Sequence, residues 1–143
     1  MSENSHLLRA KKEIVFGLKL AAAMIAGALS LALAHKQGWV DGAQVMRGNN
    51  IIIGLALAAF CNLMPKRMNG SPRSVSHATL AQSLGRVGGW CMTLAFLAWT
   101  ALWAFAPQEV ARMGSVAAVG AGVTVMIGYA VWKCATWRAP RSD

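Results

Sequence analysis

A short polar segment after the second apolar stretch of the chain holds the side chains best suited to binding. Asn62 lies at the end of that stretch, and Lys66, Arg67 and Arg73 follow in a segment, 66–86, that contains no acid. We expect the asparagine amide to fix the end of a helix and the cations to attract an acidic partner or anionic lipid headgroups. These four residues are the predicted partner-binding surface.

Side chains suited to metal or hydrolytic chemistry are scattered along the chain. The histidines fall in three separate segments, as His6, His35 and His77, so we do not expect them to converge on one ion. Glycine-rich phosphate loops and the HExxH and GxSxG patterns are missing. None of the five acids lies within an apolar stretch, where a proton-coupled exporter or ion pump normally carries a carboxylate. We predict no enzyme, no metal site and no cofactor.

Four apolar stretches must position these groups, and they take up more than half of the 143 residues. They predict an all-α fold, an integral membrane bundle of four transmembrane helices in a single membrane domain, at about residues 14–34, 48–65, 87–107 and 114–133. The second helix is expected to be short or tilted, because its uninterrupted apolar core is brief. The first carries one charge, Lys19, whose long stem lets the ammonium reach the nearer headgroups.

Basic residues gather in alternate connections between these stretches. They precede the first stretch, separate the second from the third and follow the fourth: Arg9, Lys11, Lys12, Lys66, Arg67, Arg73, Arg86, Lys133, Arg138 and Arg141. The other two connections hold Lys36, Arg47 and Arg112. Because basic loops are retained in the cytoplasm, both termini and the 66–86 loop are predicted to be cytoplasmic, in a bacterial inner membrane.

The composition agrees with a lipid environment. Charged residues make up 13% of the chain, against about 25% in an ordinary soluble domain. The net charge of +9 could suggest nucleic-acid binding, but the cations lie beside apolar segments, and no helix-turn-helix or RNA-binding signature accompanies them. We predict the lipid bilayer as a partner and no nucleic acid. Cys61, Cys91 and Cys134 lack CxxC spacing and are expected to be free thiols.

Small and aromatic side chains predict how the helices pack. Small residues line one face of the first helix (Ala22, Ala26, Ser30, Ala34) and two faces of the fourth (Gly114, Ala118, Gly122 and Gly120, Thr124, Gly128). Each face permits close approach of another helix. Trp90 and Trp132 are expected at the cytoplasmic headgroups, Trp39 and Trp103 at the outer ones, and Trp99 between helices.

Residues 76–86 allow two interpretations. Val75, Leu80, Leu84 and Val87 give this segment an apolar side, which suits a short amphipathic helix on the membrane surface. A solvated linker that leads into the third helix fits equally well.

The end of the second stretch resembles a known family. The run Cys61-Asn62-Leu63-Met64-Pro65-Lys66 is similar to the GN-x-MPK motif of the SdpI-like family of bacterial membrane immunity proteins, with Cys61 where glycine is usual. Gly70, Arg73, Thr79 and Leu80 resemble positions that follow the motif there, with Ala78 in place of a tryptophan. The resemblance, over about residues 48–85, implies a protein that protects its host from a membrane-active toxin and, in some members, holds a repressor at the membrane. The same run also suits a simple capped and anchored helix end.

The sequence therefore favours a non-catalytic membrane protein that binds another membrane protein, a peptide or lipid, with SdpI-like immunity or signalling as the sharpest version. The alternative is an accessory subunit, or a small transporter or channel that works as a homo-oligomer. That alternative predicts a water-filled path lined by Ser30, Asn49, Asn50, Asn62, Thr93, Thr100 and Thr124.

Overall fold

A computed structural model of the chain describes residues 3–63 and 75–138. They form four α-helices: α1 (Glu3–Lys36), α2 (Gly42–Leu63), α3 (Val75–Phe105) and α4 (Gln108–Arg138). The two described ranges contain no strand, and each helix is long and apolar enough to cross a membrane. The predicted all-α fold is confirmed, and the chain has the composition of a multi-pass membrane protein.

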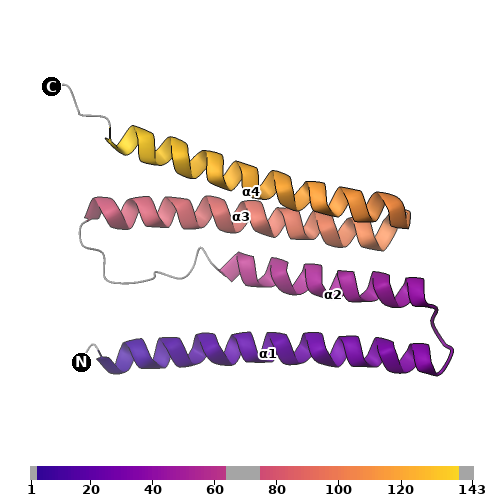
Figure 1. The fold of residues 1–143 in the computed structure, drawn as a ribbon. Coiled ribbons are helices and arrows are strands. Elements are labelled where there is room, and N and C mark those ends of the chain that lie inside the picture. Colours follow the sequence, from indigo (N-terminus) through magenta and orange to yellow (C-terminus); the bar gives the residue numbers. More distant parts are fainter. Residues whose placement is uncertain (1–2, 64–74, 139–143) are drawn as a thin grey trace.

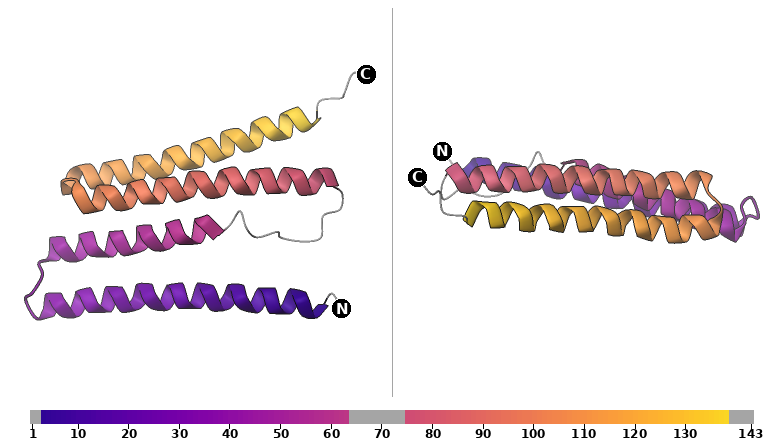
Figure 2. Two further views of the ribbon diagram at one scale, coloured as in Figure 1. Left: turned by 180° about the vertical axis from the view of Figure 1, so that it is seen from behind. Right: turned by 90° about the horizontal axis from the view of Figure 1, so that it is seen from above.

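The helices stand side by side in sequence order, as an open row (Figure 1). α1 packs against α2, α2 against α3, and α3 against α4, whereas the backbones of the other helix pairs stay apart within the described ranges. At the start of α4, one side chain reaches α2, because Gln108 Nε2 donates to Met46 Sδ at 3.3 Å. Figure 2 shows the same row from behind and from above, with neighbouring helices running in opposite directions. A closed bundle would bring α1 back to α4, but here α1 is an outer helix with one neighbour.

Both chain ends lie at the same end of the row, which we call the terminal end (Figure 1). The opposite end, the turn end, holds the two short connections, residues 37–41 and 106–107. α2 has 22 residues, whereas α1 has 34 and α3 and α4 have 31 each. At about 1.5 Å per residue, α2 alone matches a hydrocarbon layer of about 30 Å. The extra length of the other helices lies at the terminal end.

Three helices begin earlier than their apolar stretches predict. α1 begins at Glu3 instead of about residue 14, α2 at Gly42 instead of 48, and α4 at Gln108 instead of 114. Hydropathy marks where a helix enters lipid, but the helix continues into the polar region because its backbone hydrogen bonds are made within it.

The third helix also begins early, which decides between the two interpretations of residues 76–86. α3 runs without interruption from Val75 to Phe105. This stretch contains no proline, so the amphipathic pattern joins the apolar stretch in one continuous helix. The solvated linker is therefore wrong. The helix is confirmed, but it is the start of α3 and not a separate segment. The rest of the predicted loop, residues 66–74, lies outside the described residues.

Local signals close α1 and open α2 at the turn end. Gly38 has a φ of +75°, a conformation that favours glycine. The N–H groups of Gly38 and Trp39 donate to the carbonyls of His35 (2.9 Å) and Ala34 (3.0 Å), which makes a Schellman cap. The next helix starts with a capping box, because the side chains of Asp41 and Gln44 accept from each other's backbone N–H groups.

Small side chains bring α3 and α4 close together. A Cβ built on Gly122 would lie 3.0 Å from the Cβ of Ala95, and one on Gly114 would lie 3.0 Å from Leu102 Cδ1. The predicted packing face that includes Gly114 and Gly122 is therefore confirmed. The second predicted face of α4 turns outward instead: Gly120, Thr124 and Gly128 are exposed.

The first helix packs through a different face from the one predicted. Ala22, Ala26 and Ser30 are exposed, so that prediction is wrong for these three residues. α1 instead meets α2 where Ile52 Cδ1 lies 2.8 Å from a Cβ built on Gly27, and Leu31 Cδ1 lies 2.8 Å from one built on Gly48. Branched side chains set over glycines gain dispersion contacts, which drive helix association in lipid.

The described core lies in α2, α3 and α4 and consists mainly of small side chains. Its buried residues other than glycine are Ala56, Ala58, Cys61, Thr93, Ala95, Trp103, Ala111 and Ser115. The apolar span of α1 contributes none. The three later helices therefore form the packed unit, with α1 attached at its side.

Candidate functional site

The structure places one of the four predicted partner-binding residues. Asn62 lies in the last turn of α2, at the terminal end, and is exposed. Lys66, Arg67 and Arg73 lie outside the described residues. Their part of the surface stays a prediction, so the described site is the exposed end of α2 and what surrounds it.

The register between α1 and α2 shows which residues stand beside that end. Gly27 faces Ile52 and Leu31 faces Gly48 in this antiparallel pair. Leu63 follows Ile52 on α2 by as many residues as Phe16 precedes Gly27 on α1, so these two pieces of helix are equally long. The end of α2 is therefore level with about Phe16.

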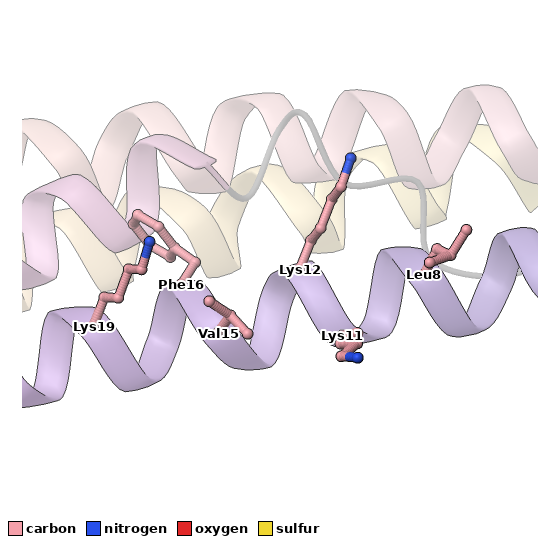
Figure 3. Close-up of a pocket in the computed structure, with 6 residues that line it drawn as sticks. All are labelled: Leu8, Lys11, Lys12, Val15, Phe16 and Lys19. Atoms are coloured by element: carbon pink, nitrogen blue, oxygen red, sulfur yellow. The ribbon is translucent and has the colours of Figure 1, made fainter.

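An open hollow of about 420 Å³ lies along α1 at this level. Its lining residues all come from α1 and include three lysines: Leu8, Lys11, Lys12, Val15, Phe16 and Lys19 (Figure 3). All three lysines are exposed. Lys12 stands about one turn beyond the level of Phe16, and Lys19 about one turn before it, beside α2. The hollow therefore spans the level at which α2 stops.

Further cations and aromatic rings lie toward the terminal end on α3 and α4. Arg86 is exposed on α3. On α4, Lys133 Nζ lies 5.7 Å from the centroid of the Trp132 ring. The centroids of the Trp132 and Tyr129 rings are 5.8 Å apart. Aromatic rings with a polar edge beside lysines are typical of residues at the headgroup level of a membrane.

Two of the three acidic side chains that the structure describes lie at the other end. Asp41 caps α2 and Glu109 lies in the first turn of α4, both at the turn end. Among the acids whose side chains are described, Glu13 is the one near the hollow, and it has an interaction of its own. The described terminal end is therefore strongly basic.

At the turn end, a partly buried arginine ties α2 to α3. Arg47 Nη2 donates to the carbonyl of Ala106, at 2.9 Å, directly after the last residue of α3. A cation suits this position because helix carbonyls there lack partners and carry partial negative charge. The sequence places Arg47 among the charges of the outer connection and does not predict this contact. The one signal for it is the position of Arg47 just before the apolar core of α2.

Two tryptophans lie between the helices, and the sequence predicted this position for one of them. Trp99 was predicted to pack between helices, and its Nε1 donates to the carbonyl of Asn50, at 3.2 Å, so that prediction is confirmed. Trp103 was predicted at the outer headgroups but is only 4% exposed, so that prediction is wrong. Its Nε1 has no hydrogen-bond partner among the described residues. Trp39, Trp90 and Trp132 are exposed, as contact with headgroups requires.

The polar residues proposed for a transport path do not converge in the described part of the chain. The hydroxyls of Ser30, Thr93, Thr100 and Thr124 each donate to a carbonyl four residues earlier in their own helix. Ser30 and Thr124 are exposed on α1 and α4, the two outer helices of the row. A common water-filled path through one copy of the chain gains no support from this arrangement.

Neither histidines nor cysteines form a cluster in the described residues. His35 Nδ1 lies 2.9 Å from the carbonyl of Val40 and holds the turn between α1 and α2. The three cysteines are free, and no group of three His, Cys, Asp or Glu side chains in the described ranges is placed to hold a metal ion.

No protein-family model, curated protein or solved structure matches this chain. The resemblance to the SdpI-like family therefore depends on the residues quoted above, of which Cys61, Asn62 and Leu63 close the described part of α2.

Proposed function

We propose that this chain is a non-catalytic protein of a bacterial inner membrane, with both termini in the cytoplasm, that binds a membrane protein or membrane peptide at its terminal end. The sharpest version is an immunity or signalling role like that of the SdpI-like family. In this proposal the partner contacts Asn62, Lys66, Arg67 and Arg73, together with the neighbouring part of α1.

The loose attachment of α1 is the observation that carries the proposal. No residue in its apolar span is buried, and large side chains such as Leu18 and Ile25 are 70% and 61% exposed. Helices associate in lipid through close packing and hydrogen bonds rather than through the hydrophobic effect. A helix with one neighbour therefore offers a free packing face to a partner helix, and lipid covers that face until the partner arrives.

The charge of the terminal end supports the same proposal. Exposed lysines on α1 and Arg86 on α3 lie there, and the sequence adds Lys66, Arg67 and Arg73 between α2 and α3. A partner with acidic residues at its cytoplasmic end is attracted and oriented by this charge.

Co-purification with charge-reversed variants tests the proposal. Tagged wild type is extracted from membranes of its own host in mild detergent, beside the double variant Lys66→Glu plus Arg73→Glu. The matched control, Lys36→Glu plus Arg112→Glu, makes the same charge change at the turn end. We expect one membrane protein to co-purify with wild type and control, and about ten-fold less of it with the first variant. Equal recovery from all three would remove the basic segment from the function.

The orientation has its own test. Alkaline phosphatase fused within residues 66–86 should be inactive, because the enzyme matures only outside the cytoplasm, whereas a fusion after Gly38 should be active. The reverse pattern would contradict the proposed topology.

A transport role makes a different prediction. Liposomes that contain the purified chain would then pass a solute faster than empty vesicles do. We expect equal flux, because the hydroxyls proposed for the path are bonded within their own helices.

A further inference from the structure

We propose that the hollow on α1 is a binding site for one anionic phospholipid, whose phosphate lies between the ammonium groups of Lys12 and Lys19. This site lies on α1 itself, and it does not depend on the partner protein proposed above. Three observations carry it: the arrangement of the lysines on one face, their depth relative to α2, and the net positive charge of the sequence around them.

The two lysines share one face of α1. They are two turns apart, about 10 Å along the helix axis, and their side chains rise with Phe16 on the side of the other helices (Figure 3). Helical side chains lean toward the start of their helix, so both lysines lean the same way and their ammonium groups stay about two turns apart. Their flexible four-carbon stems let both close on a phosphodiester that lies between them, which can accept a hydrogen bond from each.

The depth of the lysines matches the phosphate layer of a bilayer. α2 has 22 residues and is just long enough to cross the hydrocarbon layer, so its end marks the membrane boundary. Phe16 is level with that end, Lys12 lies about one turn outside it and Lys19 about one turn inside. An acidic protein segment in water can reach Lys12, which lies outside the boundary. Lys19 lies inside it, and the anionic group of a bilayer that lies between these two levels is the lipid phosphate.

The sequence around the hollow carries a net positive charge. Residues 11–19 contain three lysines and one glutamate, which leaves a net charge of +2. Val15 and Phe16 line the same hollow and offer apolar contact to the glycerol region and the first carbons of the acyl chains. Lipids with a net negative headgroup should therefore bind in preference to zwitterionic ones.

Native mass spectrometry of the purified full chain tests the proposal. Phosphatidylglycerol and phosphatidylcholine with identical acyl chains are titrated separately, and the first bound lipid is quantified. Wild type should prefer phosphatidylglycerol by about thirty-fold, which corresponds to about five-fold for each lysine. The double variant Lys12→Gln plus Lys19→Gln should lose this preference, and Lys12→Arg plus Lys19→Arg should keep it.

A second double variant, Arg86→Gln plus Lys133→Gln, removes two cations toward the same end of the row but outside the hollow. It should keep the preference. An equal loss in this control would show general surface attraction and overturn the proposal, as would equal binding of the two lipids by wild type. Competition by inorganic phosphate or by a soluble acidic peptide at the lipid's concentration would overturn the assignment to a lipid. Circular dichroism confirms that each variant is folded before it is compared.

Discussion

Replacing Gly54 by alanine tests the packing of α2 against α3. A Cβ at this position would run into the Thr100 hydroxyl oxygen and would lie 2.9 Å from Trp99 Cδ1 and 3.3 Å from the backbone carbonyl oxygen of Phe96. These neighbours cannot move freely. The Thr100 hydroxyl donates to the Phe96 carbonyl (2.9 Å), and Trp99 Nε1 donates to the carbonyl of Asn50 (3.2 Å). The methyl group must therefore push the helices apart or break one of these bonds.

The expected cost follows from a matched comparison. Overpacking a close contact costs about 1–3 kcal/mol, while alanine gains up to about 1 kcal/mol over glycine as a helix former. Gly120→Ala receives the same helical gain, but a Cβ there meets nothing within 4 Å. The difference between the two variants therefore isolates the clash, at about 2 kcal/mol. For a chain of this size the melting temperatures should differ by about 6 °C.

A thiol-reactive dye can follow the unfolding. Cys61 lies on the same helix and is 5% exposed, so it should react only once α2 separates from its neighbours. Serine at positions 91 and 134 removes the other two thiols, and both glycine variants are made in that background. If Gly54→Ala melted at the same temperature as Gly120→Ala, the close approach of α2 and α3 would be refuted.

Three further predictions concern single residues. Arg47→Met keeps the length of the side chain but loses the charged hydrogen bond to Ala106, so we expect a melting temperature lower by about 6 °C, from a loss of about 2 kcal/mol; no change would contradict the capping role. Gly38→Ala forces a side chain into a φ of +75° and should cost about 1 kcal/mol, about 3 °C in the same assay; an unchanged value would argue against the Schellman cap. In intact membranes a maleimide should label the exposed Cys134 and spare the buried Cys61, and equal labelling would contradict the burial of Cys61.

Part of the site followed from the sequence and part did not. Exposed cations at the end that holds both termini were expected, because basic residues in alternate connections fall on one side of a row of antiparallel helices. The role of Arg47 was missed, since its acceptor at Ala106 follows α3 and is distant in the chain. The hollow beside Lys12 and Lys19 was missed for a related reason. It depends on where α2 stops relative to α1, and only the register between those two helices shows this.

The sequence by itself determined the number of helices and the position of each apolar span, because length and hydropathy depend on consecutive residues and on the solvent they require. It could not decide how far α1 and α3 continue beyond those spans, because a helix is held by its own backbone bonds as readily in water as in lipid. The tertiary structure alone decided which faces meet. Lipid solvates every apolar face equally well, so hydropathy does not select which face of α1 packs. The shape of Ile52 selects it, because this side chain fits against Gly27. α2 therefore contacts Gly27 and not the small-residue face that includes Ala22 and Ala26. Among the described residues α1 packs in this way against α2 and against no other helix, so it lies at the edge of an open row.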